Sequence, residues 1–279
     1  MDFRAARHPA DHWGAVMKST CQQRGFTLIE MMITVAVLTI VLGTVVTYIS
    51  RLQRVYKTQE TNVDSTDEGR MFLDNIEREL HQSGYPNKNM YTKSNLNATP
   101  ANDVHVGAGL VNISKWNIYL EGDLDNDGTV EDVRYTLLDN TGAIATAASN
   151  CPCTLQRTQK TKLAGVPGTT ITDADVLGAN ATAVLNNVIN SGDGAGTALT
   201  IAGSTMFSAG HSSTNNALYT AYRTPMIFTG YTNAGTASID VTQIRSVEIA
   251  VNLLTNYNDS QTNMRQPLTL RTTVKLNNF

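Results

Sequence analysis

Three aspartates stand at alternate positions in the middle of the chain: Asp123, Asp125 and Asp127, with Gly128 directly after them. Carboxylate oxygens are the ligands that Ca²⁺ prefers, and in an EF-hand-type loop the side chains at positions 1, 3 and 5 converge on one ion. A glycine at position 6 permits the sharp turn that brings them together. The spacing therefore predicts a calcium site within DLDNDGTVED, residues 123–132.

The second half of this loop departs from the EF-hand pattern. The backbone carbonyl of Thr129 can add a ligand, but position 12 is Arg134, where that pattern has a bidentate glutamate. Glu131 or Asp132 must then close the site. The alternative is a solvated acidic turn in which these residue types serve only the turn geometry. We favour calcium, bound in a hairpin turn, because the carboxylates of one tight turn repel each other without a cation.

Cys151 and Cys153 are the only cysteines after residue 25, and Pro152 separates them. In an oxidising compartment they can form a disulfide, although a one-residue spacing closes a strained ring, and free thiols are the alternative. Two cysteines without a neighbouring histidine do not predict a structural zinc site. A redox role is not favoured either.

The sequence carries no recognisable catalytic pattern. His81, His105 and His211 are the histidines beyond residue 25, and no nucleophile elbow, P-loop or zinc-protease helix accompanies them. The formal net charge is -3 and charged residues make up 16% of the chain, so bulk electrostatics do not favour nucleic acid as a partner. We therefore expect no enzyme and no nucleic-acid binding.

An almost unbroken apolar run extends from Phe26 to Ile49 and carries one acid, Glu30. As a helix it would be about 36 Å long, enough to cross a hydrocarbon core of about 30 Å. A cleaved secretory signal is the alternative, but its apolar run is shorter and ends at a small-residue cleavage site, which TYISRLQRVYK does not offer. The run therefore predicts a membrane span.

Glu30 is a costly residue in such a span. A charge in the apolar part costs about 2.5–3.5 kcal/mol on insertion scales, so the acid needs a partner or a hydrated place near the headgroups. Basic residues ahead of the run, Lys18 and Arg24 among them, outnumber the acidic ones. This bias predicts a cytoplasmic N-terminus and export of the chain after Ile49, although the basic residues just beyond the span weaken it.

The stretch GFTLIE, residues 25–30, follows a basic leader and opens the apolar helix. It resembles the prepilin cleavage and methylation motif of type IV pilins and type II secretion pseudopilins. The resemblance implies that a prepilin peptidase cuts between Gly25 and Phe26 and methylates the new amine of Phe26. Residues 1–25 would then be the leader, with Met17 as an alternative translation start. Glu30 would pair with the ammonium group of a neighbouring subunit, in a low-dielectric bundle where that attraction exceeds its value in water.

The apolar periodicity predicts one helix from residue 26 to about residue 82. Residues 26–50 are its transmembrane and assembly part, and residues 51–84 are an extracytoplasmic continuation with an approximate i, i+3, i+4 rhythm. Ser83-Gly84 and Pro86 predict its end, because glycine accepts a left-handed cap and proline cannot continue a helix.

Residues 85–279 predict a β-rich periplasmic or extracellular head domain. Apolar and polar residues alternate, as they do in strands, over residues 104–113, 116–120, 133–137, 226–231, 247–254 and 268–276. Residues 141–223 are rich in Ala, Thr, Gly and Ser, and within them 174–189 could form a helix. The expected fold class is α+β and type IV pilin-like, with a long N-terminal helix laid on an antiparallel sheet.

The order of these features is similar to that of the PilW-like branch of minor pilins, over residues 67–85, 244–251 and 268–278. The resemblance implies a minor subunit of the type IV pilus, placed at or near the fibre tip to prime assembly. Its partners would be the prepilin peptidase, the major and other minor pilins, the inner-membrane assembly platform and, before assembly, the membrane. The head would be periplasmic at first and later part of an extracellular fibre. A type II secretion pseudopilin is the main alternative, and a tip adhesin or DNA-uptake subunit is the third.

Overall fold

The computed structural model describes residues 25–92, 96–146, 151–190, 199–201, 204–207, 226–258 and 265–277. Residues 1–24, which hold nearly all of the expected leader, lie outside the described residues. The chain divides into two compact units, Met1–Leu52 and Gln53–Phe279.

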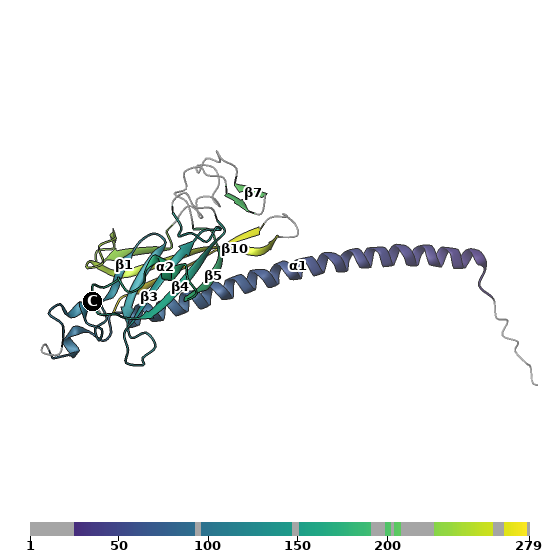
Figure 1. Ribbon diagram of the computed structural model, residues 1–279. Helices are drawn as coiled ribbons and strands as arrows, with labels where there is room; N and C mark the ends of the chain where they lie inside the picture. The colour runs from purple at the N-terminus through teal and green to yellow at the C-terminus, as the bar shows by residue number, and fades with distance from the viewer. Residues whose placement is uncertain are drawn as a thin grey trace, which may run out of the picture. The chain divides into compact units, whose positions relative to one another are not determined.

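The first unit holds the start of a 55-residue helix, α1 (Leu28–Gln82), which is the long helix in Figure 1. Thr27 caps it, because its backbone carbonyl accepts the Glu30 N–H at 3.1 Å and its hydroxyl lies 3.4 Å from the same nitrogen. The most apolar part of α1 has a mean hydropathy of 2.3 and no buried residue, and it is long enough to cross a membrane. The predicted helix is confirmed, with its start two residues after Phe26.

Hydroxyl groups within this apolar part bond back to the helix itself. The hydroxyls of Thr34, Thr39, Thr44, Thr47 and Ser50 donate to carbonyls three or four residues earlier, at 2.7–2.9 Å. This local bonding gives each of these five hydroxyl donors an acceptor within the helix, which suits a helix surrounded by hydrocarbon.

In the second unit, α1 buries one face against the sheet. Thr61, Ser65, Gly69, Phe72 and Ile76 recur at intervals of three or four residues and are buried. Gly69 allows the closest approach, because a Cβ there would collide with the side chain of Leu270. The helix stops where the sequence predicts, since Gly84 has a left-handed φ of 80°.

The head contains a nine-stranded antiparallel sheet among the described residues. Its order begins with β1 (Gly109–Ile113), β2 (Asn117–Gly122), β3 (Glu131–Leu138), β4 (Cys153–Thr161) and β5 (Ala181–Val188), and continues with β10 (Ile244–Asn258), β8 (Phe228–Thr232) and β9 (Ala237–Ser238). The last strand, β11 (Arg265–Lys275), pairs with β10. β10 is long enough to pair with β8 along residues 244–249 and with β5 at Leu253.

Short elements lie outside this sheet. β6 (Leu199–Ile201) and β7 (Ser204–Phe207) form a separate two-stranded sheet, and α2 (Asp173–Val176) is a single turn. Two 3₁₀ turns, η1 (Lys88–Met90) and η3 (Pro100–Asn102), belong to the connection between α1 and β1.

Each face of the sheet has its own apolar cluster. The larger one joins α1 to the strands, and Phe72 packs edge-on against Tyr135 with ring centroids 5.9 Å apart. The smaller one holds Tyr119 and Leu138 of the sheet with Ile171 and Val176 from the segment around α2. The observed fold is thus a long apolar N-terminal helix packed onto an antiparallel sheet, which confirms the expected α+β class (Figure 1).

The prediction of a helix over residues 174–189 is wrong. Only α2 is helical, and β5 follows it. A capping box of Thr172 and Asp175 starts the turn, and strand pairing with β4 then buries Leu185 and Val188. Tertiary pairing therefore overrides the helical apolar spacing here.

The strand expected over residues 104–113 begins only at Gly109. Before it, Val106 donates to the carbonyl of Asp103 and Gly107 donates to the carbonyl of Pro86. A turn hydrogen bond and a contact with the chain after α1 thus take the place of a strand ladder here. The strand β4 was not predicted, because its glutamines, arginine and lysine hide the alternation.

Candidate functional site

The processing segment lies at the start of the described chain. Gly25 and Phe26 precede α1 in residues without regular secondary structure, and Phe26 is 71% exposed. A Cβ on Gly25 would meet no atom within 4 Å. The bond between Gly25 and Phe26 is therefore not buried by any described residue, as cleavage by a peptidase requires.

Glu30 lies in the first turn of α1 and is exposed. It forms no ion pair within the described part of the chain. The unsatisfied N–H groups at a helix N-terminus favour an acidic side chain in the first turn. Phe26, where cleavage would create a new amine, lies four residues before Glu30 in the sequence.

A second cluster of charged groups lies at the hairpin between β2 and β3. The two strands pair in register from Asn117 opposite Thr136 to Gly122 opposite Glu131. The loop that joins them brings the carboxylates of Asp123, Asp125 and Glu131 together, with ligand oxygens that all lie within 4.8 Å of one another. The flanking elements are strands, as the hairpin expectation requires.

Hydrogen bonds inside the loop fix the first two aspartates. Asp123 accepts the N–H groups of Asp127 and Gly128 at 3.1 and 3.0 Å, and Asp125 accepts that of Asp127 at 3.2 Å. Asn126 and Gly128 have φ values of 63° and 88°, which turn the chain around the carboxylates. Each carboxylate keeps further lone pairs, so these bonds leave oxygen atoms able to coordinate a cation.

The electrostatics of the cluster favour a cation. Burial raises the pKa of Glu131 to about 7, and the neighbouring Asp125, Asp127 and Asp123 add to the rise, while a hydrogen bond from the Leu124 N–H opposes it. A divalent ion among these oxygens would offset both the burial and the repulsion. Three of the expected ligands are therefore placed where calcium can be held.

The other expected ligands are placed differently. Asp127 and Thr129 are exposed in the loop, where the Asp127 carboxylate accepts the Thr129 N–H at 2.7 Å. Asp132 points to the opposite face of β3 from Glu131, because successive strand residues alternate. Its buried carboxylate accepts the Tyr119 hydroxyl at 3.2 Å. Of the two acids expected to close the site, only Glu131 is in position.

The β2–β3 hairpin packs against the end of α1. The Asp123 N–H donates to the carbonyl of Tyr85 at 2.7 Å, and the Gly84 N–H donates to the carbonyl of Glu121 at 2.9 Å. A Cβ on Gly122 would lie 3.0 Å from the carbonyl of Gln82. The hairpin and the end of α1 are thus joined backbone to backbone.

A buried ion pair next to this junction was not predicted. The Lys162 ammonium contacts Glu121 Oε2 at 2.7 Å and donates to the carbonyls of Ala101 and Val106 at 2.7 and 2.8 Å. All three donors of the ammonium are used, which satisfies a charge that is almost completely buried. Lys162 lies between Thr161 and Leu163, and this local context gives no sequence signal for the role.

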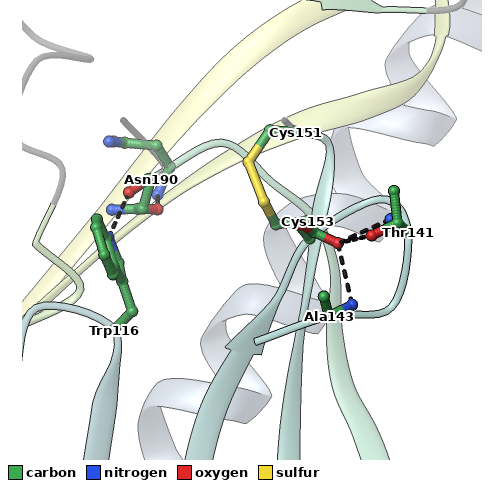
Figure 2. Close-up of a disulfide and its surroundings, with 8 residues drawn as sticks. Trp116, Thr141, Ala143, Cys151, Cys153 and Asn190 are labelled. Carbon is green, nitrogen blue, oxygen red and sulfur yellow. Dashed lines mark hydrogen bonds between the residues drawn. A yellow bond between two sulfur atoms is a disulfide. The ribbon is translucent and has the colours of Figure 1, made fainter. Parts of the chain in front are cut away.

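Cys151 and Cys153 form a disulfide, and both residues are buried (Figure 2). The same view shows Trp116, whose indole N–H donates to the carbonyl of Asn190 at 2.9 Å. A turn with Thr141 and Ala143 also appears there, and both of their N–H groups donate to Asp139. The disulfide is a covalent link at the start of β4.

The N-terminal residues match a known protein motif. Residues 21–46 match the prokaryotic N-terminal methylation motif. No curated protein and no solved structure matches the chain. The motif and the helix-on-sheet fold together support a type IV pilin-like protein, with an N-terminal helix long and apolar enough to cross a membrane. More particularly, the motif supports a pilin or pseudopilin that is processed by prepilin peptidase and assembles with other pilins.

Proposed function

We propose that the chain is a minor subunit of the type IV pilus, incorporated at or near the fibre tip to prime assembly. The single observation that carries the proposal is an apolar helix segment that no other described residue buries and that has an exposed acid, Glu30, in its first turn. Lipid can cover the apolar surface before assembly. Only a cation on another subunit can satisfy the acid once the helix has left the membrane.

Cleavage after Gly25 supplies that cation. Hydrolysis of the peptide bond leaves a charged amine on Phe26 that did not exist in the precursor. Inside a bundle of apolar helices, an amine and a carboxylate that miss each other both remain buried and unpaired, which costs several kcal/mol. Correctly registered subunits avoid this cost, so the pair selects the register of docking.

The head favours a minor subunit over a major one. Besides its main sheet it carries the separate β6–β7 pair and α2, an irregular build that suits a fibre end better than a surface repeated many times. We propose that it has no enzymatic role. A type II secretion pseudopilin shares the helix and the motif and is the second candidate.

We also propose that calcium binds Asp123, Asp125 and Glu131 and stiffens the junction between α1 and the head. The closeness of the three carboxylates and the raised pKa of Glu131 support this assignment. Isothermal titration of the detergent-solubilised protein with CaCl₂ tests it. Binding that is lost in Asp123→Asn and kept in Asp127→Asn supports the site, and equal heats for wild type and Asp123→Asn refute it.

Two experiments test this function: N-terminal sequencing of the mature protein and deletion of its gene. The mature protein should begin at N-methylphenylalanine 26, and a deletion strain should lose surface pili while type II secretion continues. Loss of secretion with normal pili would instead assign the chain to the pseudopilins. An N-terminus that is never trimmed would refute both candidates.

A further inference from the structure

The ion pair of Lys162 with Glu121 is the most deeply buried pair of charges among the described residues, since the two side chains are 1% and 0% exposed. Their nitrogen and oxygen atoms lie 2.7 Å apart. The Lys162 N–H donates to the carbonyl of Val130, just before β3, so the lysine side chain crosses the start of β3 to reach Glu121 on β2. An amine and a carboxyl group are therefore held against each other at a site closed to bulk water.

Two backbone N–H groups are directed at the Glu121 carboxylate. Gly168 donates to Oε1 at 2.9 Å, and Ala108 donates to Oε2 at 3.3 Å. Fixed donors of this kind stabilise negative charge on the oxygens, including the charge that develops when a nucleophile adds to the carboxyl carbon. The surroundings of Glu121 thus favour attack by the amine that it contacts.

A second acid, Asp132, faces the same pair. Asp132 lies directly opposite Glu121 in the β2–β3 ladder, so both side chains project from one face of the sheet. Oδ2 of Asp132 accepts the Tyr119 hydroxyl at 3.2 Å, whereas Oδ1 is buried without a hydrogen-bond partner among the described residues. Oδ1 can therefore accept a proton from a neighbouring group.

We propose that Lys162 and Glu121 condense to an intramolecular amide, with Asp132 passing protons between them. Nζ of Lys162 bonds to Cδ of Glu121, and the bond from Cδ to Oε2 breaks. Two of the three ammonium protons leave with Oε2 as water, and the third stays on the amide nitrogen. The cation and the anion become one neutral amide, so atoms and charge balance without an oxidant or another reactant.

Proximity makes this condensation feasible. Well-oriented groups within one molecule react as if present at about 10⁵–10⁸ M. The existing hydrogen bonds also fit the product, because Oε1 becomes the amide oxygen and keeps the Gly168 N–H. The amide N–H can donate to the carbonyl of Ala101 or Val106, which the ammonium contacts at 2.7 and 2.8 Å. A neutral amide also removes the desolvation cost of two buried charges.

The amide would join β2 to the segment after β4, between residues that are 41 positions apart. A cross-link stabilises the folded state by restricting the unfolded chain, and it does so more strongly for a long enclosed loop. The enclosed residues include β3 and the β2–β3 hairpin, which packs against the end of α1. This bond belongs to the head alone, so its presence or absence leaves the proposed function standing.

Peptide mass mapping of the full-length, detergent-solubilised protein tests the proposal. After disulfide reduction and trypsin digestion we expect a branched peptide in which residues 116–134 are joined to the peptide that carries Lys162. Its mass should be the sum of the two peptides less one water, and trypsin should not cleave after Lys162 because the amide removes the charge. Separate peptides with unmodified Lys162 and Glu121, from protein that unfolds cooperatively in urea, would overturn the proposal.

Three variants provide the matched comparison. Lys162→Met cannot form the bond, whereas Lys160→Met removes the neighbouring ammonium on β4 and should remain linked. Asp132→Asn keeps an acceptor for the Tyr119 hydroxyl but cannot pass protons, so the linked fraction should fall several-fold. A branched peptide that persists in Lys162→Met would refute the assigned site. An unchanged linked fraction in Asp132→Asn would refute proton transfer through this acid.

Discussion

The carboxylate of Glu79 on α1 lies 2.7 Å from the guanidinium Nη2 of Arg157 on β4. The same oxygen accepts the Arg157 Nε–H at 2.9 Å, and the other oxygen accepts the Tyr135 hydroxyl at 2.7 Å. Glu79 and Arg157 are 78 residues apart in the chain. The pair fixes the rotation of the last turns of α1 on the sheet, because both carboxylate oxygens are directed at partners on neighbouring strands.

Glu79→Ala should destabilise the head strongly. The change leaves the Arg157 guanidinium, whose side chain is 24% exposed, without its counter-charge, and we expect a loss of about 2–4 kcal/mol in the free energy of unfolding. Urea unfolding of the detergent-solubilised protein measures it. Lys88→Ala is the control, and an equal midpoint for Glu79→Ala and this control would show that the pair contributes nothing.

Glu30→Gln should separate processing from assembly. The neutral side chain keeps the shape of the glutamate but cannot attract the amine on Phe26, so cleavage continues while incorporation into fibres falls sharply. Immunoblots of sheared fibres and membranes, with the N-terminus sequenced, measure the two steps. Asp74→Asn removes an exposed charge of α1 within the head and should assemble normally. Normal assembly of Glu30→Gln would contradict the role given to this acid.

Stability should depend on pH through Glu131 when calcium is absent. The folded protein raises the pKa of this acid to about 7 from a usual value of 4.5, so the folded state binds the proton more tightly than the unfolded state. The free energy of unfolding therefore falls as the pH rises from about 4.5 to about 7. In EDTA the urea midpoint should decrease over this range, and Glu131→Gln should remove that part of the slope.

Calcium should reverse this trend, because the ion binds the ionised carboxylate. Millimolar CaCl₂ at pH 7 should raise the urea midpoint of the wild type and leave that of Glu131→Gln nearly unchanged. MgCl₂ at the same concentration is the control for ionic strength. An equal rise in both proteins would assign the stabilisation to salt rather than to the hairpin.

Gly69→Ala should destabilise the head although alanine favours helices. The added methyl group would collide with Leu270 and press on Leu253, and such overpacking costs about 1–3 kcal/mol, which over most of this range exceeds the gain of about 1 kcal/mol in helix propensity. Gly43→Ala is the matched control in the same helix, because a Cβ there meets no atom within 4 Å. Thermal unfolding should separate the two variants, and a Gly69→Ala protein as stable as the wild type would show that Leu270 moves aside.

Much of this protein is determined by local sequence. The GFTLIE motif, the apolar run, the glycine stop at residue 84 and the alternate aspartates each act through residues a few positions apart. Periodicity and turn chemistry operate at this range, which is why the long helix, its end and the acidic hairpin could be predicted.

Only the tertiary structure decided the rest, because it depends on residues that are distant in the chain. Glu131 and Asp132 are neighbours with the same charge, and the face of β3 on which each lies determines which one joins Asp123 and Asp125. Pairing with β4 turns an apparent helix into β5. The ion pair of Lys162 with Glu121 spans 41 residues, and no local pattern contains both partners. Burial and pairing energies arise only when strands come together, so a single segment of sequence does not specify them.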